Sequence, residues 1–273
     1  MSDHRRLAVS SGLLVALAAC SGGRGAPETS PEAVPGPPPP PVFTTRAPRN
    51  GLEVIGRMRR NHPSRELKRL AFTVRATQLV SDSTLLRARA YVALPGRMRV
   101  DNMPHSARTG YVRDRQRLAV FRAGQRVSTA NRVDLRTLLA YDLYAQGIDT
   151  TIMWLDSARV RFALVRRDRF AGRPVWVVGA NEDDMTSSQF WVDAEEWRVV
   201  RIIQREPRTP SLISDVRYTE FTELLEVPVP TRVEVWREGR LIEQQEISEF
   251  SVNPTLPRSL FDLSRWRAVA VGN

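Results

Sequence analysis

Cys20 is the only cysteine among the 273 residues, and it stands among small residues in the stretch LVALAACSGG (14–23). One cysteine cannot form an internal disulfide, so the fold depends on its core and its hydrogen bonds. Three histidines, His4, His62 and His105, leave little material for a histidine-based metal or catalytic site. The chemistry to be explained is therefore that of one isolated thiol.

The sequence lacks the patterns of common catalytic and metal sites. A Gly-rich phosphate loop, a G-x-S-x-G elbow and an H-E-x-x-H pair do not occur. Three neighbouring acids, Glu182, Asp183 and Asp184, lack the alternating ligands and the glycine of a calcium loop. We interpret them as a solvated hairpin loop and expect a protein that is not an enzyme and has no metal or cofactor.

The residues before Cys20 have the order of a secretion signal. A basic segment at residues 4–6 precedes an apolar segment at residues 7–19. The apolar segment is too short to span a bilayer, which needs about 20 residues. A buried N-terminal helix is the alternative, but the small residues at its end and the abrupt change of composition favour a signal.

The end of this segment, Leu17-Ala18-Ala19-Cys20, resembles the lipobox of bacterial lipoproteins. The resemblance implies that residues 1–19 are removed and that the Cys20 thiol carries diacylglycerol, so a covalent lipid on Cys20 is expected. Ser21, where an aspartate would retain the protein in the inner membrane, implies the outer membrane. We therefore predict a cell-envelope protein that is anchored by lipid and faces the periplasm.

Residues 20–50 form a linker rich in proline, glycine, serine and threonine, with too few large apolar residues to fold. Its five consecutive prolines, Pro37 to Pro41, favour an extended polyproline II spacer over a ligand for SH3 or WW domains. The net charge of +11 comes almost entirely from arginines. These are scattered and often stand beside acids, so we expect no nucleic-acid partner; weak attraction to anionic lipid is the better interpretation.

Residues 51–273 are predicted to be one folded domain that is mainly β, within the α+β class. Alternating apolar and polar residues at 84–95 and 97–103 indicate strands with one buried face, and further short strands follow to residue 254. A helix is predicted at 51–63, and two short helices at 133–158 begin near Asp134 and near Asp149 or Thr150. The apolar tail at 256–266 is expected to pack on the sheet.

The order of the segments RPVWVVGAN, FWVDAEEWRVVRI, YTEF, VPTRVEVWREGRL and VNPTLPRSLFD resembles that of outer-membrane lipoprotein-sorting proteins, in the LolA/LolB-like superfamily. The resemblance covers residues 70–266. It implies a large curved antiparallel sheet that forms an incomplete β-barrel with a short helical lid, enclosing a cavity for an acyl chain. The helices at 133–158 fall where the lid is expected.

Inward residues of the strands and the lid would line such a cavity, although ordinary core packing is the alternative for each of them. The candidates are Leu94, Met98, Val100, Val120, Leu138, Leu139, Leu143, Ile152, Trp154 and Phe190. In the soluble carrier of this family, an arginine precedes the proline of the corresponding strand segment. Here Leu94 precedes Pro95, and Arg99 is the candidate charge at the cavity mouth.

Two functions follow from this pattern. The first is a membrane-anchored lipoprotein that binds lipid or lipoprotein acyl chains, in lipoprotein sorting or in outer-membrane lipid handling. The second is an interaction or sensor module that uses the same fold to bind an envelope protein partner. The missing arginine and the long spacer favour the second function, whereas the lipobox and the ordered segments favour the first.

Overall fold

The computed structural model describes residues 46–79, 84–206 and 209–267. Residues 46–273 group into one compact unit. The predicted signal at 1–19, Cys20 and the linker up to residue 45 lie outside the described residues. Within the described part of the chain, no helix is both long enough and apolar enough to cross a membrane.

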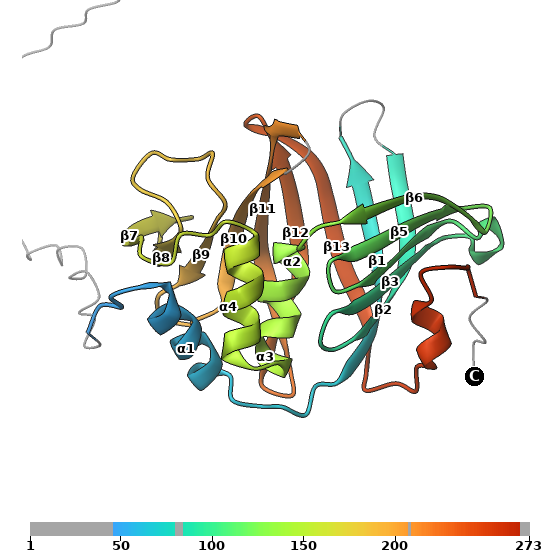
Figure 1. Cartoon of the computed structure of the whole chain (residues 1–273), viewed down its shortest axis with the longest axis horizontal. Helices are drawn as coiled ribbons and strands as arrows, with labels where there is room; N and C mark the ends of the chain where they lie inside the picture. Colours follow the sequence, from blue (N-terminus) through green and yellow to red (C-terminus); the bar gives the residue numbers. More distant parts are fainter. Residues whose placement is uncertain (1–45, 80–83, 207–208, 268–273) are drawn as a thin grey trace, which may run out of the picture. The chain divides into compact units, whose positions relative to one another are not determined.

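The described residues form one antiparallel sheet of thirteen strands in the order β6-β5-β4-β3-β2-β1-β13-β12-β11-β10-β9-β8-β7. The strands are β1 (Arg69–Gln78), β2 (Thr84–Ala93), β3 (Arg97–Asn102), β4 (Gly110–Asp114), β5 (Arg117–Arg122), β6 (Gln125–Asn131), β7 (Val165–Phe170), β8 (Arg173–Val178), β9 (Gln189–Asp193), β10 (Val199–Glu206), β11 (Thr209–Leu224), β12 (Val227–Arg237) and β13 (Arg240–Val252). Pairing of β1 with β13 joins the two halves. Because β6 and β7 are the two edges, the sheet curves without closing (Figure 1).

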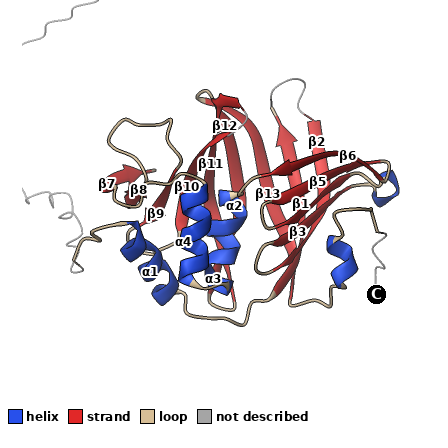
Figure 2. Cartoon of the chain, viewed as in Figure 1, coloured by secondary structure: helices blue, strands red, loops and turns tan. Residues whose placement is uncertain are grey.

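Five helical segments lie across one face of this sheet, which we call the inner face (Figures 1 and 2). They are α1 (Gly51–Asn61), α2 (Leu135–Thr137), η2 (Leu138–Asp142), α3 (Leu143–Ala145) and α4 (Ile148–Ser157). The last four connect the edge strands β6 and β7, and we call them the lid. The two helices predicted at 133–158 are confirmed, but the first is interrupted by a π-helical turn, η2.

Local sequence explains where these helices begin. The Asn50 side chain accepts a hydrogen bond from the Glu53 N–H at 3.0 Å and so caps α1. Asp134 caps α2 by accepting from the Arg136 N–H at 3.2 Å. The break at Gly147 separates α3 from α4. Both caps stand at positions where the sequence predicts a helix start.

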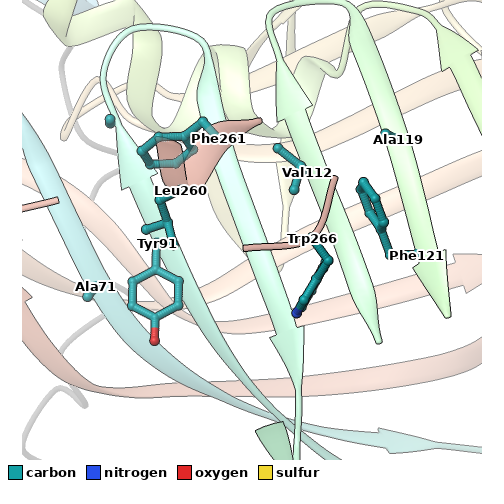
Figure 3. Close-up of a cluster of buried hydrophobic side chains, with 9 residues drawn as sticks. Ala71, Tyr91, Val112, Ala119, Phe121, Leu260, Phe261 and Trp266 are labelled. Carbon is teal, nitrogen blue, oxygen red and sulfur yellow. The ribbon is translucent and has the colours of Figure 1, made fainter. Parts of the chain in front are cut away.

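The opposite, outer face of β1–β5 is covered by the C-terminal segment. The 3-10 helix η3 (Arg258–Phe261) and the indole of Trp266 pack there against Tyr91, Val112 and Phe121 (Figure 3). The remaining short helix, η1 (His105–Ala107), connects β3 to β4. The tail therefore packs on the sheet as predicted, and the fold class, a mainly β incomplete barrel with a short helical lid, is confirmed.

Strand alternation assigns residues of β1–β5 to two rows. Cross-strand neighbours Phe72, Ala90, Val100, Tyr111 and Val120 form the inner row. The outer row, one residue away on the same strands, contains the cross-strand neighbours Ala71, Tyr91, Arg99, Val112 and Ala119. Residues of one row point to the same side because side chains alternate along a strand.

Candidate functional site

A cavity of about 260 Å³ lies between the inner face and the lid, and we call it the inner chamber. Aliphatic and aromatic side chains make up most of its wall. The sheet provides Phe72, Val74, Ala76, Leu86, Ala88, Met98, Val100, Asn102, Tyr111, Tyr218, Pro230, Val233, Glu243, Gln245 and Ile247, and the lid segment provides Asp134, Arg136, Thr137 and Tyr141. A curved sheet that its own side chains do not fill leaves such a space.

Contacts between the sheet and the lid hold the chamber together. Phe72 stacks on Tyr141 with ring centroids 6.3 Å apart. The Met98 sulfur accepts contacts at 3.8 Å from both the Tyr111 hydroxyl and the Thr137 hydroxyl, so it joins β3, β4 and α2. Burial raises the pKa of Tyr141, so this phenol stays neutral.

Charged groups stand at one place in the chamber wall, around Asp134. Its carboxylate accepts from Arg136 Nε at 3.2 Å and from the Thr137 hydroxyl at 3.1 Å, and Arg113 Nη2 lies 3.4 Å away. Burial opposes ionisation, but the two guanidiniums outweigh it and hold the pKa of Asp134 well below its usual range. The Asp134 carboxylate in turn raises the pKa of Arg136. This cluster is therefore ionised, with more positive than negative charge.

Two further cavities adjoin this cluster. A polar pocket of about 230 Å³ shares Asp134, Arg136 and Glu243 with the inner chamber. A lid pocket of about 190 Å³ shares Asp134 and Thr137 with it. The lid pocket lies between the lid and the turns β2–β3 and β4–β5; its lining includes Pro95, Gly96, Arg113, Arg115, Leu138, Asp142 and Trp154.

Asp142 ties the lid to the β2–β3 turn. Its carboxylate accepts the Gly96 N–H at 2.7 Å, and Gly96 has a φ of +87°, which favours glycine. Burial raises the pKa of Asp142 to about 7, against the lowering effect of the Gly96 hydrogen bond. Asp134 raises this pKa further and Arg113 lowers it. Asp142 is thus a buried carboxyl that titrates near neutral pH.

The predicted lining residues divide into three groups. Met98 and Val100 line the inner chamber, whereas Leu138 and Trp154 line the lid pocket. Two others are outside the core but line none of these cavities: Val120, in the inner row next to Tyr111, and Ile152, half-buried on α4. The others are core residues that line none of these three cavities: Leu94, Leu139, Leu143 and Phe190.

Arg99 does not lie at a cavity mouth, and this corrects the expectation from the sequence. It belongs to the outer row and is 1% exposed. Its guanidinium donates to both oxygens of Asp101, at 2.5 and 2.9 Å, and lies 4.0 Å from the centroid of the Trp266 ring. Alternation within β3 already separates Arg99 from Met98 and Val100, so the sequence contained the signal for its true position.

The aromatic and ionic wall of the site was missed by the sequence analysis. Tyr111, Tyr141 and Tyr218 come from β4, the lid and β11, and only the sheet topology brings them together. For Arg136 a local signal exists, because it stands two residues after a predicted helix cap and is the only basic residue of the lid. Nothing in the sequence pairs it with β13.

Solved structures confirm the predicted fold. The chain is similar to a putative outer membrane lipoprotein-sorting protein domain from Vibrio parahaemolyticus (TM-score 0.54, 11% identity, 78% of this chain and 96% of that chain). It is also similar to a LolA superfamily protein from Nitrosomonas europaea (TM-score 0.50, 15% identity, 78% and 97%) and to a DUF1329 family protein from Desulfovibrio piger (TM-score 0.53, 14% identity, 78% and 95%). No family model and no curated protein matches the sequence. At these identities the likeness shows the fold alone, and that fold is LolA-like.

Proposed function

We propose that this protein is a lipid-anchored envelope lipoprotein that binds the acyl chain of a lipid or lipoprotein in its inner chamber. The observation that carries the proposal is the apolar chamber itself, built between the curved sheet and the lid. Ligand sites in barrel-like folds are typically apolar cavities with a few polar groups, and this chamber has that composition. The protein acts by binding a ligand and catalyses no reaction.

The LolA-like fold supports this function. The similar structure from Vibrio parahaemolyticus is described as a putative outer membrane lipoprotein-sorting protein domain, which gives an envelope location a structural precedent. The lipobox at residues 17–20 supplies the anchor in this proposal. Stable anchoring needs more than a single acyl chain, and a diacylglycerol on Cys20 meets that requirement.

Filling the chamber tests the binding function. Val100→Trp places an indole where Val100 now lines the cavity, and Val127→Trp places the same group on exposed β6 as a matched control. Binding of a fluorescent long-chain fatty acid to the purified full chain is measured by titration, and native mass spectrometry detects co-purified lipid. We expect Val100→Trp to abolish binding and Val127→Trp to preserve it.

Two outcomes contradict the proposal. An unmodified chain that never binds the fatty acid and always purifies empty has no acyl-chain function. A Val100→Trp variant that binds as tightly as the unmodified chain places the ligand elsewhere. Recovery of one stoichiometric protein partner by an empty protein would favour the interaction module instead.

The anchor is tested separately by the mass of the mature chain. The unmodified protein should lack residues 1–19 and carry diacylglycerol. Cys20→Ser should remain an unprocessed precursor because a hydroxyl does not replace the thiol as lipid acceptor, whereas Ser21→Ala keeps the thiol and should be lipidated. Normal processing and membrane attachment of Cys20→Ser would rule out the lipoprotein anchor without affecting the chamber.

A further inference from the structure

The inner chamber and the polar pocket meet at Arg136. This side chain lines both cavities, together with Asp134 and Glu243. On one side of this boundary are apolar groups such as Phe72 and Val100, and on the other are polar groups such as Gln204. The two adjoining cavities therefore differ in polarity, as do the two ends of an amphiphile.

Arg136 keeps part of its hydrogen-bonding capacity. Within the described part of the chain, its guanidinium donates one side-chain hydrogen bond, from Nε to the Asp134 carboxylate at 3.2 Å. Its side chain is 39% exposed, and it lines both cavities. The remaining guanidinium nitrogens can donate to a carboxylate or phosphate in a fork geometry.

Asp134 does not cancel this charge, because it is shared. The same carboxylate lies 3.4 Å from Arg113 Nη2. Counted with Glu243, the polar pocket is lined by three arginines (Arg132, Arg136 and Arg237) and two carboxylates (Asp134 and Glu243), so its lining carries a net positive charge. Gln204 fixes this segment from β10: its amide donates to the Val133 carbonyl at 2.8 Å and accepts the Leu135 N–H at 3.3 Å. These two hydrogen bonds fix the start of α2, and with it the backbone of Arg136, against β10.

Glu243 is the opposing charge at this boundary. It faces both cavities from β13 and receives a hydrogen bond from Gln245. An anionic group on Arg136 would be repelled by this carboxylate, and a neutral ligand would not. The pair Arg136 and Glu243 therefore provides two substitutions that change the binding of an anion in opposite directions.

Size also favours a ligand that occupies both spaces. The chamber, about 260 Å³, and the pocket, about 230 Å³, are each slightly smaller than a typical small-molecule site, which measures roughly 300–1,000 Å³. A ligand that crosses the boundary at Arg136 would use both volumes. It would bury its apolar part against the sheet and leave its polar end among the arginines.

We infer that the preferred ligand is an anionic amphiphile, with its acyl chain in the inner chamber and its carboxylate or phosphate head group on Arg136. This inference rests on the proposed function, since it names the class of lipid that the same chamber takes. The head group contributes selectivity through a charge-assisted hydrogen bond in a site partly shielded from water.

The test compares a fluorescent long-chain fatty acid with its methyl ester, which has the same chain and no charge. Both are titrated into the full chain and into Arg136→Gln, Arg136→Lys, Glu243→Gln and Arg87→Gln. Arg87 is an exposed outer-face residue, so Arg87→Gln removes the same charge at a distance from the cavities. Thermal unfolding of each variant confirms that it is folded.

We expect Arg136→Gln to weaken binding of the acid by about tenfold, the effect of one charged hydrogen bond. Binding of the ester should not change. Arg136→Lys should recover part of the loss because it keeps the charge, Glu243→Gln should tighten binding of the acid, and Arg87→Gln should change neither ligand. Competition by a lysophosphatidylglycerol then distinguishes a phosphate head group from a carboxylate, and preference for either anion over the ester supports the inference.

Equal affinities for acid and ester, unaffected by Arg136→Gln, would overturn the inference and leave acyl-chain binding intact. A Glu243→Gln variant that weakens binding of the acid would also overturn it, because the carboxylate would then be part of the head-group site. If neither probe binds the unmodified chain, the proposed function itself has failed.

Discussion

The inner and outer rows come from the same five strands and are separated by one residue at every position, yet among the described residues the inner row borders the chamber and the outer row borders a packed cluster. Three residues of the inner row line the chamber: Phe72, Val100 and Tyr111. The outer row is covered by η3 and Trp266 and belongs to a cluster of buried side chains (Figure 3). On these strands the outer side is therefore a packed core, whereas the inner side borders a cavity.

The two faces also use arginine differently. Arg99 on the outer face is 1% exposed, and its guanidinium is surrounded by the Asp101 carboxylate, the Leu260 carbonyl and the Trp266 ring. Arg136 on the lid has a side chain that is 39% exposed and lines two cavities. Burial of an arginine therefore does not indicate a binding site. A guanidinium that lines a cavity and has N–H groups without a hydrogen-bond partner does indicate one.

Breaking the Arg99 pair should have the largest effect on stability. Arg99→Met keeps much of the side-chain volume under Trp266 but removes the guanidinium from the buried Asp101 carboxylate, which is left with only the exposed His105 ring, 3.8 Å away. Loss of one member of a buried ion pair costs about 3–5 kcal/mol. We expect a loss of this size in the free energy of unfolding, measured by urea denaturation, with acyl-chain affinity of the folded fraction unchanged.

Two further variants sharpen that result. Arg99→Met combined with Asp101→Leu removes the uncompensated charge and should recover much of the stability, because apolar replacements of buried pairs are often neutral. Arg87→Met removes an exposed arginine whose ion pair with Glu249 spans 3.4 Å, and pairs of this kind contribute only about 0–1 kcal/mol. If Arg87→Met were as damaging as Arg99→Met, burial would not explain the effect.

Asp142 gives the stability of the inner side a dependence on pH. Burial raises its pKa in the folded protein to about 7, above its ordinary value of 3.8. The folded state therefore binds the proton more tightly than the unfolded state, so the protonated carboxyl stabilises the fold at low pH. This stabilisation, on the order of a few kcal/mol, is lost progressively as the pH rises from about 4 to about 7.

Asp142→Asn removes this titration while its amide oxygen still accepts the Gly96 N–H. We expect the difference in unfolding free energy between Asp142→Asn and the unmodified chain to grow in favour of the variant between pH 4 and pH 7, roughly the interval between the two pKa values. Asp114→Asn, at a half-buried carboxylate 2.8 Å from Arg117, is the control. A difference that does not change with pH would mean that Asp142 is already ionised in the folded protein.

The sequence predicts the fold well because the fold depends on local signals, such as strand alternation and helix caps, and on the order of segments along the chain. Alternation in β2 and β3 identifies the strands and also shows which residues share a face. On β3 it puts Met98 and Val100 on one face and Arg99 on the other, so the prediction that all three border one cavity disagrees with this alternation. Apolar periodicity cannot distinguish a cavity wall from a core, because both require apolar side chains. Leu139 and Phe190 are core for that reason. The junction of Arg136 with Glu243 depends on the sheet order, which no local signal contains.

The smallest expected effect comes from an alanine-to-leucine substitution made once on each face of the sheet. Ala119 lies in the outer row, fully packed, and Ala88 lines the inner chamber. Ala119→Leu should lower the unfolding free energy by about 1–3 kcal/mol because the cluster has no room for three more carbons. Ala88→Leu extends into existing space, so we expect a change in unfolding free energy of less than about 1 kcal/mol, together with weaker binding of the fluorescent fatty acid.

Urea denaturation and the fatty-acid titration on the same two variants make this comparison decisive. Because both positions are strand alanines, β-propensity and the loss of side-chain entropy are matched, and the local space is the main difference between them. Equal destabilisation by Ala88→Leu and Ala119→Leu would mean that the chamber closes around its own side chains in solution. The inner face would then be a core like the outer one, and an acyl chain would need to open the lid before it could enter.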